Sequence, residues 1–198
     1  MQLMGENYSK EDVFKNSSNI FKDLITKHCE TFSRLPAFEK AIFEKFNTVK
    51  THVKNSSLEK EFRTTITQKF IKIEEFADLH KTEEYGDGVK NNYALVAEEH
   101  YYNVSYAFDV SVFNRIIKIT DAVERKKQQG KFDGYKTQVS KFKITQDYVL
   151  KYYFPRKIKS VSNPKAKISE DRKSMELQFS ITDCLQNPEI TSVEVLLE

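Results

Sequence analysis

Residues 102–112 read YNVSYAFDVSV, and whether this stretch is a strand or a helix decides the fold of the chain. Apolar residues at even positions alternate strictly with small or polar residues at odd positions, which is typical of a half-buried strand. Part of the same stretch also fits one face of a helix, because apolar residues recur every fourth position at Val104, Phe108, Val112 and Ile116. No Gly or Pro lies between Gly88 and Gly130. Since successive strands need turns, we favour one long helix over 90–128, with strands plus a helix as the alternative.

The sequence on either side of this stretch predicts more helices. Apolar residues at three-and-four spacing predict amphipathic helices over 9–35, 37–53 and 58–79. Pro36 separates the first two, and Ser56 with Glu59 fits a capping box before the third. The clearest turn is Tyr85-Gly86-Asp87-Gly88. A further helix is predicted over 133–154, ended by Pro155.

The C-terminal segment has the pattern of strands. Met175, Leu177, Phe179 and Ile181 alternate with polar residues, and strand-forming residues follow from Ile190 to Leu197. We therefore expect an α+β fold, mostly α, with long amphipathic helices packed as antiparallel hairpins and a small C-terminal antiparallel β unit. Residues 1–154 would form the helical body, in which 90–112 could instead be strand. Residues 155–198 would form a β meander packed on the helices.

Charge is distributed unevenly along the chain. Residues 115–167 contain 15 Lys or Arg and four acids, a net charge of 15 − 4 = +11, so the remainder carries 3 − 11 = −8. One interpretation is a solvated basic face with counter-charges nearby. The other is a surface for an anionic partner, which could be nucleic acid, phospholipid headgroups or an acidic protein.

Motifs for catalysis, metal binding or cofactor binding are missing from the sequence. None of the four histidines pairs with another His or Cys at helical ligand spacing, and no nucleophile elbow or phosphate-binding loop occurs. Cys29 and Cys184 match no CxxC pattern, so we expect two reduced thiols. We predict a protein without enzymatic activity, cofactor or metal.

Aromatic and basic residues interleave at the predicted helix-to-strand junction around Pro155, where exposed rings could stack on bases while basic groups contact phosphates. The alternative is that these aromatic residues anchor the junction internally. The candidate anion-binding or partner-binding residues are Lys151, Tyr152, Tyr153, Arg156, Lys157, Lys159, Lys165 and Lys167.

These observations favour a structural or adaptor protein that acts through protein–protein interaction or assembly. The strand-forming terminus Val193–Leu197 could pair with another chain and so support partner binding or self-association. The alternative is a binding module for nucleic acid or anionic lipid that uses residues 115–167. No signal peptide or membrane-spanning segment is evident, so we expect a cytoplasmic protein. A secreted or periplasmic mature chain is the alternative.

Overall fold

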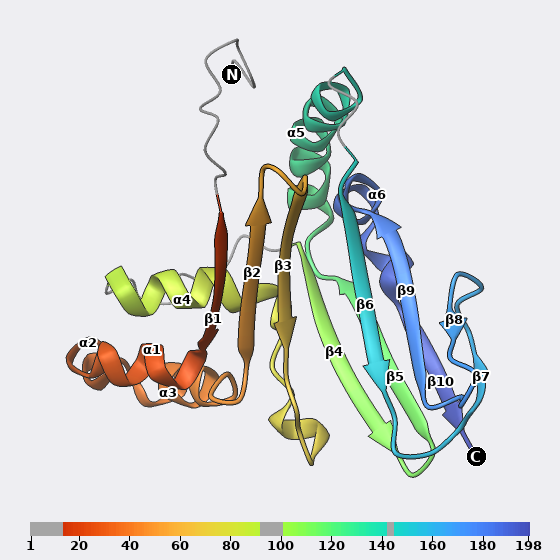
Figure 1. Cartoon of the computed structure of the whole chain (residues 1–198), viewed down its shortest axis with the longest axis horizontal. Helices are drawn as coiled ribbons and strands as arrows, with labels where there is room; N and C mark the ends of the chain where they lie inside the picture. The colour runs from red at the N-terminus through yellow and green to blue at the C-terminus, as the bar shows by residue number, and fades with distance from the viewer. Residues whose placement is uncertain (1–13, 92–100, 142–144) are drawn as a thin grey trace. The chain divides into compact units, whose positions relative to one another are not determined.

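Antiparallel β-sheet, rather than paired long helices, organises this chain in a computed structural model (Figure 1). The structure describes residues 14–91, 101–141 and 145–198, in which ten strands form three antiparallel sheets alongside six α-helices. The prediction of a mostly helical fold built from long hairpins, a helical bundle, is therefore wrong. The chain divides into two compact units, Met1–Ala97 and Glu98–Glu198, whereas the sequence predicted a boundary after residue 154.

The first unit combines a three-stranded sheet with short helices. The sheet has the order β1-β2-β3, with β1 at Lys15–Ile20, β2 at Lys50–Ser56 and β3 at Glu61–Thr67. The α-helices are α1 at Phe21–Lys27, α2 at Cys29–Arg34, α3 at Ala37–Glu44 and α4 at Thr82–Asn91. Two 3₁₀ turns precede α4, η1 at Ile73–Glu75 and η2 at Leu79–Lys81.

Aromatic side chains form the core of the first unit. The ring of Phe46 lies 5.3 Å from that of Phe21 and 5.1 Å from that of Tyr85, and Phe43 lies 5.4 Å from Tyr85. All four residues are buried. Edge-to-face and tilted contacts of this kind stabilise beyond the apolar area that they bury. The core therefore joins the segment around α1 to α3 and α4.

The predicted helices of the first unit are interrupted by strands. The helix predicted over 9–35 is replaced by β1, α1 and α2 within its described part, and the one over 58–79 by β3 and the 3₁₀ turns. The stripe over 37–53 is helical only to Glu44, where the chain turns towards β2. The turn predicted at 85–88 lies inside α4.

The predicted capping contact at Ser56 exists, but it closes a hairpin instead of starting a helix. The Glu59 backbone N–H donates to Ser56 Oγ at 3.0 Å within the turn between β2 and β3. Lys60, in the same turn, has φ 55°. A local Ser contact satisfies either a helix N-terminus or a turn, which is why the sequence pattern was ambiguous.

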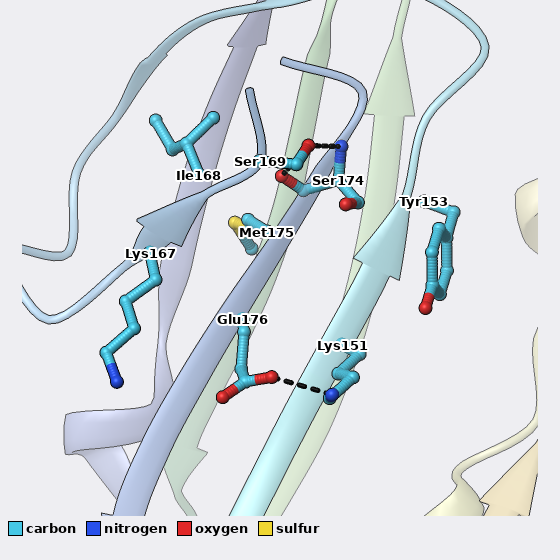
Figure 2. A pocket seen from close by; sticks show the side chains of 8 residues that line it. All are labelled: Lys151, Tyr153, Lys167, Ile168, Ser169, Ser174, Met175 and Glu176. Carbon is cyan, nitrogen blue, oxygen red and sulfur yellow. Dashed lines mark hydrogen bonds and ion pairs between the residues drawn. The ribbon is translucent and has the colours of Figure 1, made fainter. Parts of the chain in front are cut away.

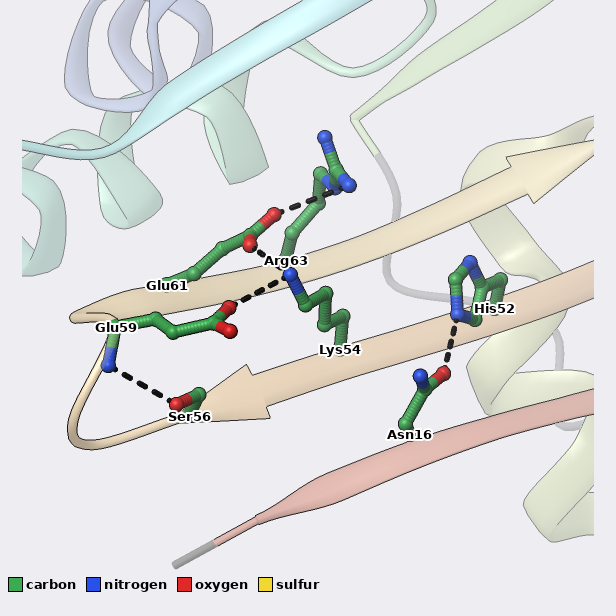
Figure 3. Close-up of polar contacts among 7 residues, drawn as sticks. All are labelled: Asn16, His52, Lys54, Ser56, Glu59, Glu61 and Arg63. Carbon is green, nitrogen blue, oxygen red and sulfur yellow. Dashed lines mark hydrogen bonds and ion pairs between the residues drawn. The ribbon is translucent and has the colours of Figure 1, made fainter. Parts of the chain in front are cut away.

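Polar side chains cover one face of this sheet (Figure 3). Lys54 Nζ lies 2.7 Å from Glu59 Oε2 and 2.5 Å from Glu61 Oε2. Its hydrogen bonds to these carboxylates, the one to Glu59 first, raise the pKa of Lys54. On the neighbouring strand pair, His52 Nε2 lies 2.8 Å from Asn16 Oδ1. These contacts link all three strands on a hydrophilic surface.

One glutamine fixes the long loop after β3. Gln68 Nε2 donates to the carbonyls of Lys45 at 2.9 Å and Glu75 at 3.0 Å, while Gln68 Oε1 accepts from the Ala77 N–H at 2.8 Å. Because this one side chain satisfies three backbone groups, it holds the loop against the end of α3.

The second unit is a two-layer sandwich of sheets. One sheet has the order β4-β5-β10-β7, with β4 at Tyr102–Asp109, β5 at Val112–Ile119, β10 at Val193–Leu197 and β7 at Ile158–Val161. The other has the order β6-β9-β8, with β6 at Asp147–Tyr153, β9 at Ser174–Ser180 and β8 at Lys167–Ile168. The helical segments are α5 at Ala122–Lys141, α6 at Ile181–Gln186 and η3 at Pro188–Thr191.

Alternation along the strands builds the interior of the sandwich. The ring of Phe113 on β5 lies 5.1 Å from Tyr152 and 5.5 Å from Phe154, so side chains from the two sheets meet. Buried apolar residues from both layers surround them: Ile117, Ile158, Met175, Leu177, Phe179, Val193, Val195 and Leu197. Within this interior, Arg115 Nη1 donates to the carbonyl and hydroxyl oxygens of Thr191 at 2.8 and 2.5 Å. This contact ties η3 to β5.

The long helix favoured over 90–128 is replaced by a hairpin. Its strands β4 and β5 pair along their full length, from Tyr102 opposite Ile119 to Asp109 opposite Val112. The strand alternative is therefore correct for the opening stretch, and α5 supplies the helix that follows. Residues 92–100 lie outside the described residues. The predicted helix over 133–154 corresponds to the end of α5 and to β6.

The C-terminal strands exist, but they do not form a separate meander on helices. β7 and β10 belong to one sheet and β9 to the other. β10 lies between β5 and β7, and Val193, Val195 and Leu197 are buried. The expectation that this terminus pairs with another chain is therefore wrong, because both of its edges already have strand partners.

Candidate interaction surface on the second unit

Three of the eight sequence-predicted residues meet on the outer face of the sheet β6-β9-β8. Lys151, Tyr153 and Lys167 line an open pocket of about 270 Å³ (Figure 2). The other residues that line it come from β8, β9 and the turn between them: Ile168, Ser169, Ser174, Met175 and Glu176. Strand register explains the meeting, because Glu176 lies opposite Lys151 on one side and opposite Lys167 on the other.

Charge in this row is partly balanced within the sheet. Lys151 Nζ lies 2.7 Å from Glu176 Oε2. The hydrogen bond from Lys151, with the further positive charge of Lys167, lowers the pKa of Glu176. The carboxylate therefore stays ionised at neutral pH and lies between two ammonium groups. A ligand reaching this row meets a net charge of +1 on these three side chains.

Tyr152 and Tyr153 are adjacent but lie on opposite faces of the sheet. Tyr153 is 79% exposed. Tyr152 packs against Phe113 in the interior, and burial raises its pKa well above the ordinary value. Successive strand residues alternate between faces, so the two rings cannot form one stacking platform.

The remaining candidates are spread over other parts of the second unit. Arg156 donates to the carbonyl of Val110 and, at 3.1 Å, to that of Glu198, which makes it an anchor for the hairpin and for β10. Lys157 and Lys159 are exposed around the start of β7. Lys165 Nζ lies 5.3 Å from the centre of the Phe179 ring. The eight residues therefore do not form one continuous basic surface.

Counter-charges for the basic segment lie in the same unit. The first unit has 15 basic and 15 acidic residues, whereas the second has 17 and 14, a net charge of 17 − 14 = +3. The balancing −8 therefore falls within the second unit itself. Arg125 lies 3.4 Å from Glu189, and Lys151 pairs with Glu176. This distribution favours the interpretation of a solvated and internally paired basic segment.

An open strand edge is the feature that sequence reasoning missed. Within the described residues β6 has a strand neighbour on one side only, β9. The Phe154 N–H bonds the Lys173 carbonyl and the Ile181 N–H bonds the Gln146 carbonyl, which fixes the phase of the ladder. Even-numbered residues of β6 thus direct their N–H and C=O groups at β9, and odd-numbered residues direct theirs away from it.

The side chains of these odd-numbered residues are exposed as well. Val149 is 41% exposed and Tyr153 79%, and both lie on the outer face of the sheet. β6 contains no Pro, which would remove an N–H from the edge, and its charged residues are Asp147 and Lys151. The signal was the alternation of DYVLKYY at 147–153, which the prediction of a helix over 133–154 overrode.

The described residues include both cysteines and side chains of the types that ligate metal ions. Cys29 and Cys184 are free, and burial raises the pKa of Cys184 to about 11, which keeps its thiol protonated at neutral pH. The described residues contain no cluster of three His, Cys, Asp or Glu side chains suited to a metal ion. Among their helices, none combines the length and apolar character needed to cross a bilayer.

Comparisons with known proteins add no relative to this description. No family model, curated protein or solved structure matches the chain.

Proposed function

We propose that this chain is a non-catalytic interaction protein that binds an extended protein segment along the open edge of β6. The observation that carries the proposal is the coincidence of outward-directed backbone groups and exposed side chains at Asp147, Val149 and Tyr153. An added strand would hydrogen-bond to this edge and extend the sheet β6-β9-β8. Seven residues in β6 offer an edge on the order of 23 Å long.

Side chains on the outer face supply selectivity in this proposal. Tyr153 offers a large exposed ring on β6, and Val149 offers exposed apolar surface four residues earlier on the same face of the same strand. Lys151 lies between them on the edge strand itself, so an acidic side chain opposite it on the bound segment would be favoured. Aromatic and opposite-charge contacts between neighbouring strands each contribute roughly 0.2–1 kcal/mol. Backbone pairing would thus give affinity, and the outward side chains of β6 would select sequence.

Selection of peptides displayed on phage tests the proposal without a known partner. Val149→Pro removes a backbone N–H that points away from β9, so the internal ladder is preserved. Peptides enriched on the wild-type protein should bind this variant at least about tenfold more weakly, because hydrogen bonds at the centre of the edge are lost.

The matched control is Val104→Pro. The Thr120 N–H donates to the Tyr101 carbonyl, so the odd-numbered residues of β4 direct their backbone N–H and C=O groups at β5. The backbone N–H of Val104 therefore points away from β5, as that of Val149 points away from β9. Both variants should keep the far-UV circular dichroism of the wild type. Peptides that bind Val149→Pro as well as the wild type, or that are lost equally from both variants, would refute the proposed site.

Nucleic acid or anionic lipid remains the competing partner for the basic segment. Lys157, Lys159 and Lys167 are exposed and could contact phosphates. Fluorescence anisotropy with a mixed-sequence oligonucleotide and co-sedimentation with vesicles containing phosphatidylserine distinguish this alternative. Tight, steeply salt-dependent binding that Lys157→Glu with Lys159→Glu abolishes, and that Val149→Pro leaves intact, would favour it over the β6 edge.

A further inference from the structure

We infer that the segment bound at β6 is β6 of a second copy of this chain, paired antiparallel about a two-fold axis at Val149. The inference rests on the proposed function and names its partner. It is motivated by the charge pattern along the odd-numbered positions, which is acidic at Asp147, neutral at Val149 and basic at Lys151. A pattern of this kind is complementary to itself when the strand is reversed.

The register follows from this charge pattern. With Val149 opposite Val149 of the partner subunit, Asp147 lies opposite Lys151 of the partner subunit, and the same pair recurs across the axis. Moving the axis to Lys151 would place two like charges opposite each other, which is destabilising. Moving it to Leu150 would place Asp147 opposite Tyr153 and form no ion pair. Of these three registers, the one centred on Val149 alone forms two ion pairs.

Backbone geometry is compatible with the same register. Asp147, Val149 and Lys151 all direct their backbone groups away from β9, so their directly opposed pairs would be of the hydrogen-bonded type. Each such pair exchanges two N–H···O=C bonds. The two sheets would then join into a continuous sheet of six strands.

The interior side of β6 also gains from such pairing. Tyr148 and Leu150 are only half-buried, whereas Phe179 and Leu177, their partners on the neighbouring strand β9, are buried. In the register centred on Val149, Tyr148 lies opposite Leu150 of the partner subunit. Apolar contact across the interface would therefore cover side chains that the single chain leaves partly open to water.

Charge reversal gives a test that depends on register. In Asp147→Lys alone and in Lys151→Asp alone, both opposed pairs carry like charges, so each variant should dimerise about tenfold or more weakly than the wild type. Mixing the two variants restores two opposite-charge pairs and should restore dimers. Sedimentation velocity over a concentration series measures all three samples, with Lys159→Asp as a charge-matched control away from the edge.

Cysteine cross-linking tests the position of the axis. In a background of Cys29→Ser and Cys184→Ser, Val149→Cys should form a disulfide-linked dimer on mild oxidation, because opposed residues of a hydrogen-bonded pair lie about 5.5 Å apart at Cα. Tyr153→Cys is the control, since its two copies would lie roughly 25 Å apart. Cross-linking of both variants at equal rates would overturn the register.

The outcomes separate this inference from the proposed function. A wild-type chain that stays monomeric at high concentration overturns the homodimer, and so does a mixture of charge variants that fails to associate. If displayed peptides still bind the wild type and are lost from Val149→Pro, the edge is an interaction site whose partner is a different protein. If neither association nor peptide binding depends on Val149, both fail together.

Discussion

Replacing Val110 with glycine should stabilise the second unit. Val110 occupies the turn between β4 and β5 with φ 44°, a conformation in which a β-branched side chain is strained. Its side chain is 79% exposed, so its removal sacrifices little packing. The turn itself stays anchored, because Arg156 donates to the Val110 carbonyl rather than to its side chain.

The size of the effect is a balance of two terms. A left-handed conformation costs a residue with a side chain about 1–2 kcal/mol, and glycine avoids this cost. Glycine in turn gives the unfolded chain more freedom, which costs about 0.4–1 kcal/mol on folding. The expected net gain is therefore about 0.5–1 kcal/mol, which corresponds to a rise in Tm of about 1–4 °C for a chain of this length.

Thermal unfolding followed by circular dichroism measures this shift. The matched control is Val123→Gly, because Val123 is 81% exposed but lies in the first turn of α5, where glycine is a poorer helix former than valine. That variant should lose on the order of 0.5 kcal/mol. If Val110→Gly lowers the Tm as much as Val123→Gly does, the explanation by backbone strain is refuted.

Three further predictions concern other side chains. Gln68→Ala should destabilise the first unit by about 1–3 kcal/mol, since it leaves backbone groups at both ends of the loop without their partner; chemical denaturation measures this, and an unchanged midpoint would contradict it. Lys151→Met should raise the pKa of Glu176 towards its ordinary value, as followed by carboxyl NMR. The Lys151 hydrogen bond lowers the pKa of Glu176 in the folded chain. The stability that this hydrogen bond contributes is therefore present above the pKa of Glu176 in the unfolded chain and is lost as pH falls through its pKa in the folded chain. With a pKa of about 11, only about one Cys184 side chain in a thousand should be a thiolate at pH 8, so Cys184 should react with iodoacetamide more slowly than the exposed Cys29. Equal reaction rates of the two cysteines, measured by mass spectrometry, would contradict the burial of Cys184.

Local patterns in the sequence predicted only part of this fold. The alternation at 175–181 and the strand-forming residues near 193–197 correspond to β9 and β10, and the apolar stripe after Pro36 begins as α3. Which strands share a sheet could not be predicted, because β10 pairs with β5 about 80 residues earlier in the chain. The spacing of apolar residues indicates whether a segment is a helix or a strand, whereas the choice of strand partner depends on packing between segments that are distant in the sequence.

Turn chemistry explains why the hairpins were missed. The turns at Lys60, Val110 and Arg172 place residues other than glycine at positive φ, at 55°, 44° and 58°. Glycines that would ordinarily mark turns lie inside helices instead, and in the described residues none has positive φ. Turns predicted from Gly and Pro therefore fall inside helices, and the turns that connect the strands contain neither residue at positive φ and were not predicted.

The candidate surface was predicted in composition but not in arrangement. The segment around Pro155 does contain an exposed tyrosine, Tyr153, and exposed lysines. Because a helix was expected there, the sequence pattern could not predict that Tyr152 and Tyr153 lie on opposite faces of a sheet. For the same reason it could not predict that Lys151 pairs with Glu176 on the neighbouring strand. The edge itself depends on the order of strands in the sheet, which no local pattern encodes.

Amide hydrogen exchange at Val149, measured by NMR as a function of protein concentration, tests the central claim most directly. In the monomer the Val149 N–H points away from β9 and should exchange quickly, whereas the Leu150 N–H, directed at β9, is protected. Raising the concentration should slow exchange at Val149 and leave Leu150 unchanged. A Val149 amide that is equally protected at every dilution, or that stays unprotected at the highest concentration, would contradict the claim that β6 is an open edge at which a second copy pairs.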